Sequence, residues 1–349
     1  MIRTQIAIPT LVRVKPGAAG RVGLYARRHG FSEIVVLHSA DLHMDLMQRL
    51  CDGLKAEDIG VLHRWPVQEA SFEQARELFP RIPARTRAII GYGGGKALDV
   101  AKYVAFLTRL PYIAVPTSLS NDGFCSPQSS LTLEGRRKSL PSAMPFGVAL
   151  DTEICLAAPE ILWLSGVGDL VAKLTAVADW KLAFNAVGTL VDDFAALLSD
   201  ATVFQFIARP TRDIEGVRLL GTALMLNGIA MEVCGSSRPA SGSEHLISHA
   251  LDSLGGKPRM HGLQVGVAAY LVSLLQGQNS AAIADLFAKT GFWDAVAADP
   301  FRRGDWLEAL RRAPSIKQDF YTVLSSRDCL SEADQFLRTD PHLQRCVTD

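Results

Sequence analysis

Three of the eight histidines in this 349-residue chain stand close together, and a carboxylate precedes them. His245 and His249 are four residues apart, so a helix would place both on one face. His261 follows just before another expected helix, and Asp169 stands where we expect a helix to begin. Two imidazoles and one carboxylate bind a divalent metal ion and leave open positions for a substrate oxygen. The cluster therefore predicts a metal site. Sequence spacing alone does not bring Asp169 to the histidines, and a lone histidine is more often a core residue.

A run of glycines ends one expected strand and opens an expected helix. Gly93, Gly94 and Gly95 are consecutive, so backbone amides can approach a pyrophosphate closely, and the start of a helix adds free N–H donors and a favourable dipole. The usual GxGxxG fingerprint is absent after the first expected strand, where His38 and Ser39 stand instead. The pattern favours a dinucleotide site, with a plain glycine-rich turn as the alternative.

A polar loop follows the next expected strand, in the segment VPTSLSNDG. Its side chains would lie at the carboxyl edge of the sheet, where open α/β folds bind ligands. Thr117 and Ser118 can hydrogen-bond to a cofactor there, and Asp122 can accept a hydrogen bond from a substrate hydroxyl. The alternative is an Asx-turn in which Asp122 only caps the loop.

Alternating strands and helices are needed to position these motifs. Short apolar runs predict strands over 33–37, 61–67, 87–92 and 112–117 and a fifth strand that ends at 151. Amphipathic stretches between them predict helices over 42–54, 71–79 and 96–107, and alternation around Glu134 and Gly135 predicts a hairpin over 129–140. This order indicates a parallel, doubly wound sheet of Rossmann-like type.

The character of the chain changes after Pro159, where β-branched runs nearly vanish. Helical periodicity covers 169–184, 191–208, 214–233, 244–254, 263–275 and 281–290. The chain is also longer than the ~250–300 residues at which a single core stops growing. We therefore predict an α/β dinucleotide-binding domain over 1–158 and an all-helical metal-binding and substrate domain over 159–349.

Composition excludes several classes of function. Lys plus Arg equals Asp plus Glu, 36 each, so no net charge attracts the whole protein to nucleic acid. There is no secretory signal and no run of roughly eighteen apolar residues, so we expect a cytoplasmic protein without a membrane span. Six scattered cysteines without a CxxC pair argue against a disulfide framework. The hydrolase, P-loop and zincin motifs GxSxG, GxxxxGK[ST] and HExxH are absent.

Taken together, the motifs resemble those of the iron-dependent alcohol dehydrogenase and dehydroquinate synthase superfamily, and within it the sn-glycerol-1-phosphate dehydrogenase branch. The likeness extends over nearly the whole chain. It rests on GYGGGKALDVAK, VPTSLSNDG, Gly168-Asp169 followed by TAVADWK, SGSEHLISH and HGLQVG. The resemblance implies a dehydroquinate synthase-like fold, in which an α/β domain is followed by a helical domain.

The resemblance also implies roles for individual residues. The cofactor-binding residues it implies are Gly93, Gly94, Gly95, Asp99, Thr117 and Ser118. The metal ligands it implies are Asp169, His245 and His261. The catalytic residues it implies are Asp122, which would bind a substrate hydroxyl, His249, which would relay a proton, and Lys102, for which a structural role stays equally open.

The implied reaction is the reduction of dihydroxyacetone phosphate to sn-glycerol 1-phosphate by NAD(H) or NADP(H), with one divalent metal ion. Zinc is the first candidate for the metal, and iron or nickel are alternatives. His38, which is not acidic, stands after the first strand, so nothing there excludes NADP. Arg137, Lys138 and Ser139 in the hairpin are candidates for binding the substrate phosphate, although a basic hairpin is more often simply solvated.

Three other functions stay open on this sequence. The first is a dehydrogenase of unphosphorylated polyols or other ketones on the same scaffold. The second is a lyase of the dehydroquinate synthase kind, which would show no net consumption of NADH. The third is a non-catalytic relative that only binds metal or nucleotide. We also expect a homo-oligomer, as in related enzymes, although no interface can be recognised.

Overall fold

The computed structural model describes residues 6–257 and 259–349, which form two compact units. The sheet unit comprises the residues up to Ala158 together with Asp213–Glu232, and the helical unit comprises Pro159–Arg212 and Val233–Asp349. The predicted division into folding domains at 158/159 stays a prediction. As a matter of packing, one helix from the later part of the chain groups with the sheet unit.

A six-stranded parallel sheet forms the centre of the sheet unit. Its strands are β1 (Leu11–Lys15), β2 (Glu33–Ser39), β3 (Gly60–Val67), β4 (Ala88–Gly93), β5 (Tyr112–Pro116) and β8 (Gly147–Asp151). Their order is β1-β8-β5-β4-β2-β3, and every pairing is parallel. Every residue of β4, β5 and β8 is buried, which explains why these strands read as unbroken apolar runs. The expected α/β fold with a parallel sheet is confirmed.

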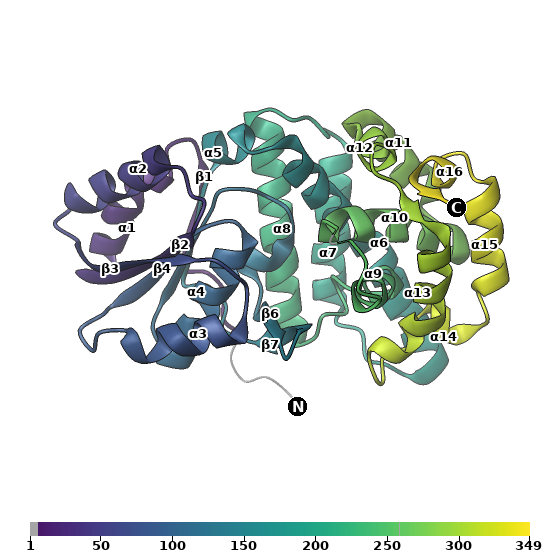
Figure 1. The fold of residues 1–349 in the computed structure, drawn as a ribbon, viewed down its shortest axis with the longest axis horizontal. Coiled ribbons are helices and arrows are strands. Elements are labelled where there is room, and N and C mark those ends of the chain that lie inside the picture. Colours follow the sequence, from purple (N-terminus) through teal and green to yellow (C-terminus); the bar gives the residue numbers. More distant parts are fainter. Residues whose placement is uncertain (1–5, 258) are drawn as a thin grey trace. The chain divides into compact units, whose positions relative to one another are not determined.

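Helices cover both faces of this sheet, with α1 and α2 on one side and α3 and α4 on the other (Figure 1). The helices of the sheet unit are α1 (Val22–Arg28), α2 (Met44–Lys55), α3 (Phe72–Leu78), α4 (Gly95–Thr108), α5 (Thr152–Ala157) and α8 (Ile214–Cys234). Three short 3-10 turns accompany them, η1 (Ala19–Arg21), η2 (Phe79–Arg81) and η3 (Asp122–Cys125).

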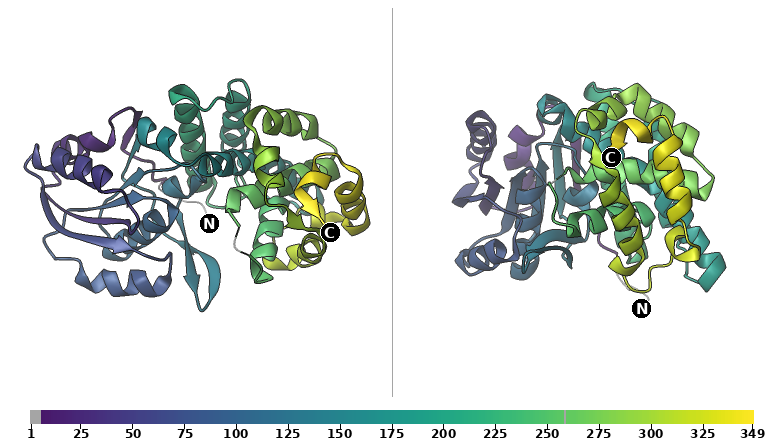
Figure 2. Two further views of the ribbon diagram at one scale, coloured as in Figure 1. Left: turned by 45° about the horizontal axis from the view of Figure 1, so that its top comes forward. Right: turned by 45° about the vertical axis from the view of Figure 1, so that its right-hand side comes forward.

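The predicted hairpin is also confirmed, as a separate two-stranded antiparallel sheet of β6 (Gln128–Leu133) and β7 (Arg136–Pro141). Glu134 and Gly135 form its turn, both with positive φ (54° and 73°). Figure 2 shows the hairpin standing apart from the six-stranded sheet.

Strand β1 was not predicted from the sequence. Only Leu11 of this edge strand is fully buried, so the strand has little periodic signal of its own. It depends on its neighbour β8, whose last residue, the buried Asp151, accepts hydrogen bonds from the backbone N–H groups of Gly17 (3.1 Å) and Ala19 (3.2 Å). The carboxylate thus fixes the loop that follows β1 to the end of β8.

The helical unit is built almost entirely of helices, as expected. They are α6 (Glu160–Val187), α7 (Asp193–Ile207), α9 (Ser243–Ser253), α10 (His261–Gln276), α11 (Ser280–Thr290), α12 (Phe292–Ala297), α13 (Arg303–Ile316), α14 (Val323–Ser326), α15 (Leu330–Thr339) and α16 (Leu343–Cys346). Among the described residues, two-residue strands β9 (Phe301–Arg302) and β10 (Val347–Thr348) form the one exception, a short parallel pair.

Helices α6 and α8 are long and apolar enough to cross a membrane by length and composition alone. In the structure, 83% of the most apolar window of α6 and 61% of that of α8 are buried inside the protein. Core helices pass the same test, so the apolar character of both helices is accounted for by packing.

Glycines allow α6 and α10 to cross at backbone contact. A Cβ atom on Gly168 of α6 would lie 2.0 Å from the carbonyl oxygen of Gly262 in α10. A Cβ on Gly262 would lie 1.8 Å from the carbonyl oxygen of Ser165, and one on Gly266 would lie 2.9 Å from the Cα of Gly168. No larger residue fits at these positions unless the helices move apart.

Replacement of Gly168 with alanine should therefore destabilise the protein. We expect the free energy of unfolding to fall by about 2–3 kcal/mol, because the new methyl group overpacks a rigid helix crossing. Urea unfolding monitored by tryptophan fluorescence measures this. The matched control is Gly304→Ala in α13, where a Cβ meets nothing within 4 Å. There the free energy of unfolding should rise by about 0.5–1 kcal/mol. Equal stability of Gly168→Ala and the wild type would mean that the two helices do not cross this closely.

Candidate metal and nucleotide sites

The three predicted metal ligands converge in the helical unit. Asp169 comes from α6, His245 from α9 and His261 from the first turn of α10. One ligand atom from each lies within 4.8 Å of the others. The Nε2 atoms of His245 and His261 are 3.7 Å and 3.9 Å from Oδ1 of Asp169. Donor atoms that share one ion at about 2.0–2.2 Å can lie at most about 4.4 Å apart, so the two Asp–His separations fit a bound metal.

Asp169 does not begin a helix, as the sequence had suggested. It lies in the interior of α6, which begins at Glu160. The segment before it contains Gly166 and Gly168, which lower helix propensity and gave the impression of a break. Here the close packing with α10 overrides propensity. The carboxylate is therefore held by a continuous helix, with 1% of its side chain exposed.

Hydrogen bonds from neighbouring residues set the tautomers of both histidines. Nδ1 of His245 lies 2.9 Å from Oε1 of the Glu244 carboxylate, which can only accept, so this nitrogen carries a proton. The hydroxyl of Ser248 donates to Oε1 of Gln264 (2.9 Å), so it accepts from Nδ1 of His261 (3.4 Å). In both rings, Nε2 is therefore the atom that faces Asp169 and could bind a metal ion.

A buried lysine sets the charge of the cluster. Nζ of Lys173, one turn after Asp169 on α6, donates to Oδ2 of Asp169 (3.3 Å) and to the backbone carbonyl of Ala240 (3.3 Å). Its side chain is fully buried. Lys173 thus occupies one carboxylate oxygen and leaves Oδ1 directed at the histidines. Sequence reasoning missed this residue; its spacing of four from Asp169 was the signal that could have found it.

The charges of the cluster shift the pKa of each member. Burial opposes ionisation of Asp169, but Lys173, His245 and His261 outweigh it and hold the pKa of Asp169 below its ordinary range. Burial lowers the pKa of His245, yet its hydrogen bonds to Asp169 and Glu244 dominate and raise that pKa to about 8. Burial and the charge of His245 hold the pKa of His261 well below its ordinary range. A metal ion that binds here therefore displaces a proton from His245.

A second layer of hydrogen bonds supports Glu244. Its carboxylate accepts from the backbone N–H of Gly242 (2.6 Å) and from the hydroxyl of Thr175 (2.8 Å), in addition to His245. Asp179, also buried, accepts from the N–H groups of Ser243 (2.7 Å) and Val323 (2.8 Å). These bonds fix the start of α9 and so fix the imidazole of His245.

His249 lies beside the cluster, as predicted from its position one turn after His245. Its ring centroid is 6.0 Å from that of His261 and 6.4 Å from that of His245. The rings of His249 and His261 are nearly parallel, 28° apart. His249 is only partly buried.

In the sheet unit, the glycine run forms the turn between β4 and α4. Gly93 has a φ of +144°, and a Cβ there would lie 2.1 Å from the hydroxyl oxygen of Ser39 at the end of β2. That hydroxyl accepts from the N–H of Gly94 (3.0 Å). Gly94 and Gly95 have nothing within 4 Å of a Cβ position, so their backbone faces open space at the start of α4. This is the geometry of an anion-binding helix N-terminus. Ser39, which shapes it, carried no sequence signal beyond its place at a strand end.

Thr117 and Ser118 lie next to this turn. The N–H of Thr117 donates to the carbonyl of Gly93 (3.0 Å), which joins the ends of β5 and β4. Both side chains are partly exposed. The predicted cofactor residues at 93–95 and 117–118 are therefore brought together by the sheet.

Asp99, Lys102 and Asp122 form another group in the sheet unit. Nζ of Lys102 donates to the carbonyl of Gly123 (2.6 Å) and lies 3.5 Å from Oδ1 of Asp99. Asp122 begins the short turn η3 and lies near enough to raise the pKa of Lys102, which burial lowers. Burial also raises the pKa of Asp99, against the charge of Lys102. Only 1% of the Lys102 side chain is exposed. Through its hydrogen bond to Gly123, this lysine holds the turn that carries Asp122.

The phosphate candidates Arg137, Lys138 and Ser139 are exposed along β7. Nε of Arg137 donates across the hairpin to the hydroxyl of Ser130 (2.8 Å). The charge of Arg137 also reaches Asp99 and lowers its pKa. The hairpin thus lies close to α4.

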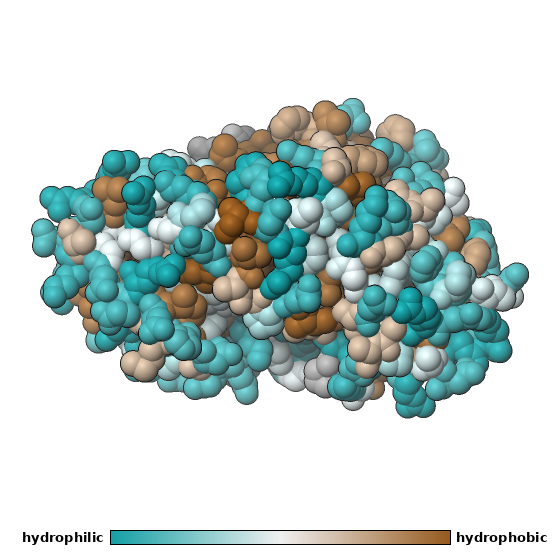
Figure 3. Space-filling view, turned by 90° about the horizontal axis from the view of Figure 1, so that it is seen from above, coloured by the Kyte–Doolittle hydropathy of each residue, from teal (hydrophilic) through white to brown (hydrophobic). Residues whose placement is uncertain are grey.

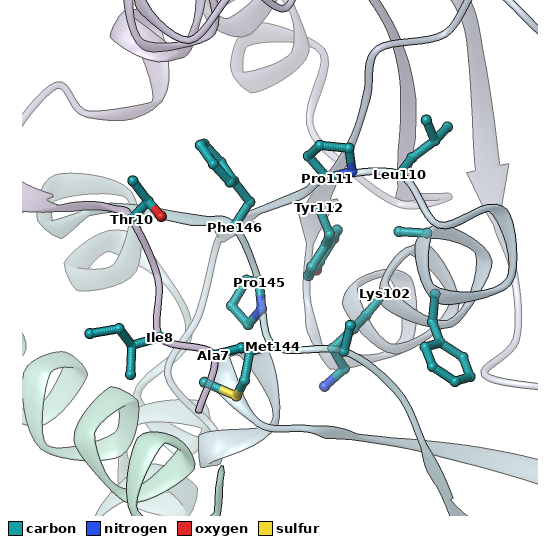
Figure 4. Close-up of a pocket in the computed structure, with 13 residues that line it drawn as sticks. Ala7, Ile8, Thr10, Lys102, Leu110, Pro111, Tyr112, Met144, Pro145 and Phe146 are labelled. Carbon is teal, nitrogen blue, oxygen red and sulfur yellow. The ribbon is translucent and has the colours of Figure 1, made fainter. Parts of the chain in front are cut away.

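A cavity of about 280 Å³ lies elsewhere in the sheet unit, at the amino ends of β5 and β8. Lys102 and Tyr112 line it from α4 and β5, and Met144 and Pro145 from the segment before β8 (Figure 4). Lys102 is the only predicted site residue among those that line it. Its wall is mainly apolar.

The chain is similar to known dehydrogenases. A family model for iron-containing alcohol dehydrogenases matches residues 13–159. The glycerol-1-phosphate dehydrogenase [NAD(P)+] of Thermofilum pendens is 36% identical over 324 residues, which cover 91% of this chain and 92% of that protein. The enzyme of the same name from Methanothermobacter thermautotrophicus is 33% identical, over 95% of this chain and 97% of that protein.

Solved structures share the fold at lower identity. Glycerol dehydrogenase from Schizosaccharomyces pombe superposes with a TM-score of 0.77 at 19% identity and covers 99% of this chain and 92% of its own. Sulfoacetaldehyde reductase from Bifidobacterium kashiwanohense, in complex with NAD+, gives a TM-score of 0.73 at 17% identity over 97% and 100% of the two chains. At this identity the likeness shows the fold alone.

The buried Asp179 should make stability depend on pH. Burial and the charge of Glu244 raise its pKa from 3.8 to about 6. A carboxyl whose pKa is raised by folding binds its proton more tightly in the native state. Proton binding by Asp179 therefore stabilises the folded state fully below pH 3.8, and this stabilisation is lost as pH rises through about 6. The free energy of unfolding of the wild type minus that of Asp179→Asn should therefore fall by roughly 2–3 kcal/mol between pH 4 and pH 7. Denaturant unfolding of both proteins with chelator present measures this difference in the free energy of unfolding. A difference that stays constant or rises between pH 4 and pH 7 would contradict the prediction.

Proposed function

Because this chain belongs to the glycerol-1-phosphate dehydrogenase family, we propose that it is a metal-dependent NAD(P)H oxidoreductase that reduces dihydroxyacetone phosphate to sn-glycerol 1-phosphate. The observation that carries the proposal is the convergence of two imidazole Nε2 atoms on one carboxylate oxygen of the buried Asp169. Charged groups are costly to bury, so a buried cluster of this kind marks a candidate functional site, and two imidazoles with one carboxylate suit a catalytic metal.

In this proposal Asp169, His245 and His261 hold one divalent ion, with zinc the first candidate and iron or nickel as alternatives. When bound, the ion supplies Lewis-acid chemistry, which polarises a ketone oxygen, and the nicotinamide cofactor supplies the hydride. Lys173 neutralises one carboxylate oxygen of Asp169 and so directs the other to the ion. Glu244 and Ser248 keep the two imidazoles in the tautomers that bind metal.

The glycine turn is proposed to hold the cofactor pyrophosphate. The open backbone at Gly94 and Gly95 lets a phosphate approach the start of α4, where the helix dipole favours an anion. Thr117 and Ser118, which lie next to this turn, would contact the cofactor. Ser39, rather than an acidic residue, ends β2, so a 2′-phosphate meets no repulsion there and both NADH and NADPH are expected to serve.

The remaining predicted residues are assigned to substrate binding and proton transfer. Asp122 would accept a hydrogen bond from a substrate hydroxyl, and Lys102 would position the turn that carries it through its bond to Gly123. His249, which is partly exposed beside the metal-ligand cluster, would hold the proton that completes the reduction. Arg137 and Lys138 stay candidates for binding the substrate phosphate.

The first experiment follows oxidation of NADH and of NADPH with dihydroxyacetone phosphate, and with unphosphorylated dihydroxyacetone as the control. Enzyme stripped by a chelator should be inactive on both and should regain activity on the phosphate ester after addition of zinc, iron or nickel. The Asp169→Asn variant should not bind the metal ion. Its kcat/KM should fall by at least about 10³-fold, because the ion no longer stabilises the charge that develops on the substrate oxygen.

The outcomes separate the competing functions. Turnover of the unphosphorylated ketone alone would identify a polyol dehydrogenase. Tightly bound NAD without net NADH oxidation would identify a lyase. Metal binding without any turnover would identify a non-catalytic relative, and activity that survives complete metal removal would overturn the metal site.

A second test concerns Glu244. Glu244→Gln should weaken metal affinity by about 10–100-fold, because the amide no longer fixes the tautomer of His245 as a carboxylate does. Competition against a chromogenic chelator measures the affinity, and circular dichroism verifies the fold. Glu153→Gln, at an exposed residue in the first turn of α5, is the matched control and should bind metal as the wild type does. Unchanged affinity in Glu244→Gln would show that this carboxylate does not support the ligand.

A further inference from the structure

Two cations of the helical unit, Arg238 and Lys317, form no ion pair within the described part of the chain. The other lysines of this unit each pair with an aspartate. These pairs are Lys173–Asp169, Lys181–Asp200, Lys257–Asp299 and Lys289–Asp285. Hydrophilic residues cover most of the face drawn in Figure 3, so a single exposed charge needs no explanation. A buried arginine beside a second cation does need one, because such side chains are rarely buried unless they are paired.

Both cations lie against the ring of Phe320. Cζ of Arg238 is 3.7 Å from the ring centroid, and Nζ of Lys317 is 3.9 Å from it. The two positive groups are therefore no farther apart than these two distances combined. Arg238 comes from the segment between α8 and α9 and is only 5% exposed, whereas Lys317 directly follows α13. Nζ of Lys317 also donates to the hydroxyl of Ser237 (2.9 Å).

The surroundings disfavour the charges of both groups. Burial lowers the pKa of Arg238, and burial together with the charge of Arg238 lowers the pKa of Lys317 from 10.5 to about 8. The end of α13 favours a cation, yet it does not offset this effect. Asp179 acts on Arg238 only from a distance. Its carboxylate accepts instead from three other donors, the N–H groups of Ser243 and Val323 and Nε2 of Gln276.

Several donors of this pair are left for a ligand. The guanidinium of Arg238 makes one hydrogen bond with the described residues, from Nη1 to the carbonyl of Tyr321 (2.6 Å). Its Nε and Nη2 atoms make none with them. The hydroxyl of Ser237 accepts from Lys317, so its own proton can be donated to an anion. The positive edge of the Phe320 ring adds a further attraction for negative charge.

The pair lies apart from the metal-ligand cluster. Asp179 is ten residues after Asp169 on α6, which is roughly 15 Å along the helix. The N–H of Val323 binds Asp179, and the carbonyl of Tyr321, two residues earlier, binds Arg238. Among the acidic groups, Asp179 is the one that shifts the pKa of Arg238. An anion held by this pair is therefore not the phosphate of a substrate bound at the metal site.

We infer that Arg238, Lys317 and Ser237 form a binding site for a phosphate anion, either inorganic phosphate or a small phosphate monoester. A guanidinium and an ammonium are the usual partners of phosphate oxygens. Donors on opposite sides of one phosphate can be about 8 Å apart, which is enough to span the two cations on Phe320. The inference does not rest on the proposed activity.

The anion would join two segments that support the start of α9. In the segment before α9, the carbonyl of Ala240 accepts from Lys173 (3.3 Å). After α13, the N–H of Val323 donates to Asp179 (2.8 Å), which also binds the N–H of Ser243. A ligand that bridges the two segments restrains both, so binding at this site stabilises the layer of hydrogen bonds around the metal-ligand helix.

Calorimetric titration of the full-length protein with inorganic phosphate, and separately with methyl phosphate, tests the site. Lys317→Gln should weaken the binding of phosphate by at least about 10-fold, because one of the two charges is lost. Lys317→Arg, which keeps the charge, should bind within about 3-fold of the wild type. Lys55→Gln, at an exposed lysine in the last turn of α2, is the matched control and should bind as the wild type does. Binding of inorganic phosphate without methyl phosphate would identify the free anion as the ligand.

Hydrogen exchange locates the bound anion. Phosphate should slow exchange of the amides in residues 236–242 and 318–323 of the wild type and leave them unchanged in Lys317→Gln. Phosphate bound at the glycine turn before α4 would instead protect residues 93–97 in both proteins, so the outcome for this site is separate from that for the proposed cofactor site. Equal phosphate affinity of Lys317→Gln and the wild type, or no protection of the two segments, would overturn the inference.

Discussion

The crossing of α6 and α10 depends on backbone contact that only glycine permits. Gly168 of α6 meets the carbonyl of Gly262 in α10, at a distance that leaves no room for a Cβ atom. Asp169 and His261 are the sequence neighbours of these two glycines, so the contact that joins the helices also sets the distance between carboxylate and imidazole. Helix axes usually lie 8–10 Å apart when side chains separate them, and that spacing would move the ligand atoms out of reach.

Several charged groups lie in the interior of the helical unit, close to this crossing. Asp169, Lys173 and Glu244 are at most 1% exposed. Each such charge costs several kcal/mol to desolvate unless hydrogen bonds and opposite charges compensate. Here each carboxylate oxygen has at least one partner among imidazoles, amides, hydroxyls or the lysine. A purely structural core would be at least as stable with apolar side chains, so the network is better explained by the ion it can bind than by stability.

Periodicity and turn chemistry predicted most of the fold. Buried parallel strands read as unbroken apolar runs, and the hairpin turn at Glu134 and Gly135 was recognisable from local residues alone. The spacing of the histidines, together with the family resemblance, pointed to a set of ligands that the structure brings together. The sequence could not show the packing contacts between elements that are far apart in the chain. Strand β1 is defined by its neighbour, Ser39 acts on the turn between β4 and α4, and the glycine before Asp169 suggested a break where tertiary packing maintains a helix.

Helix α8 has a consequence for how the chain folds during synthesis. It belongs to the sheet unit, where Gly228 lies against the backbone of Cys125 and Gly221 against Leu150, although the 54 residues 159–212 of the helical unit precede it. The nascent sheet unit therefore cannot be completed when residue 158 emerges and must wait for residue 232. At about 5–20 residues per second, the intervening 74 residues take roughly 4–15 seconds. During that interval, the surface of the sheet unit that α8 covers stays exposed, so the sheet unit is completed only after the first part of the helical unit has been synthesised.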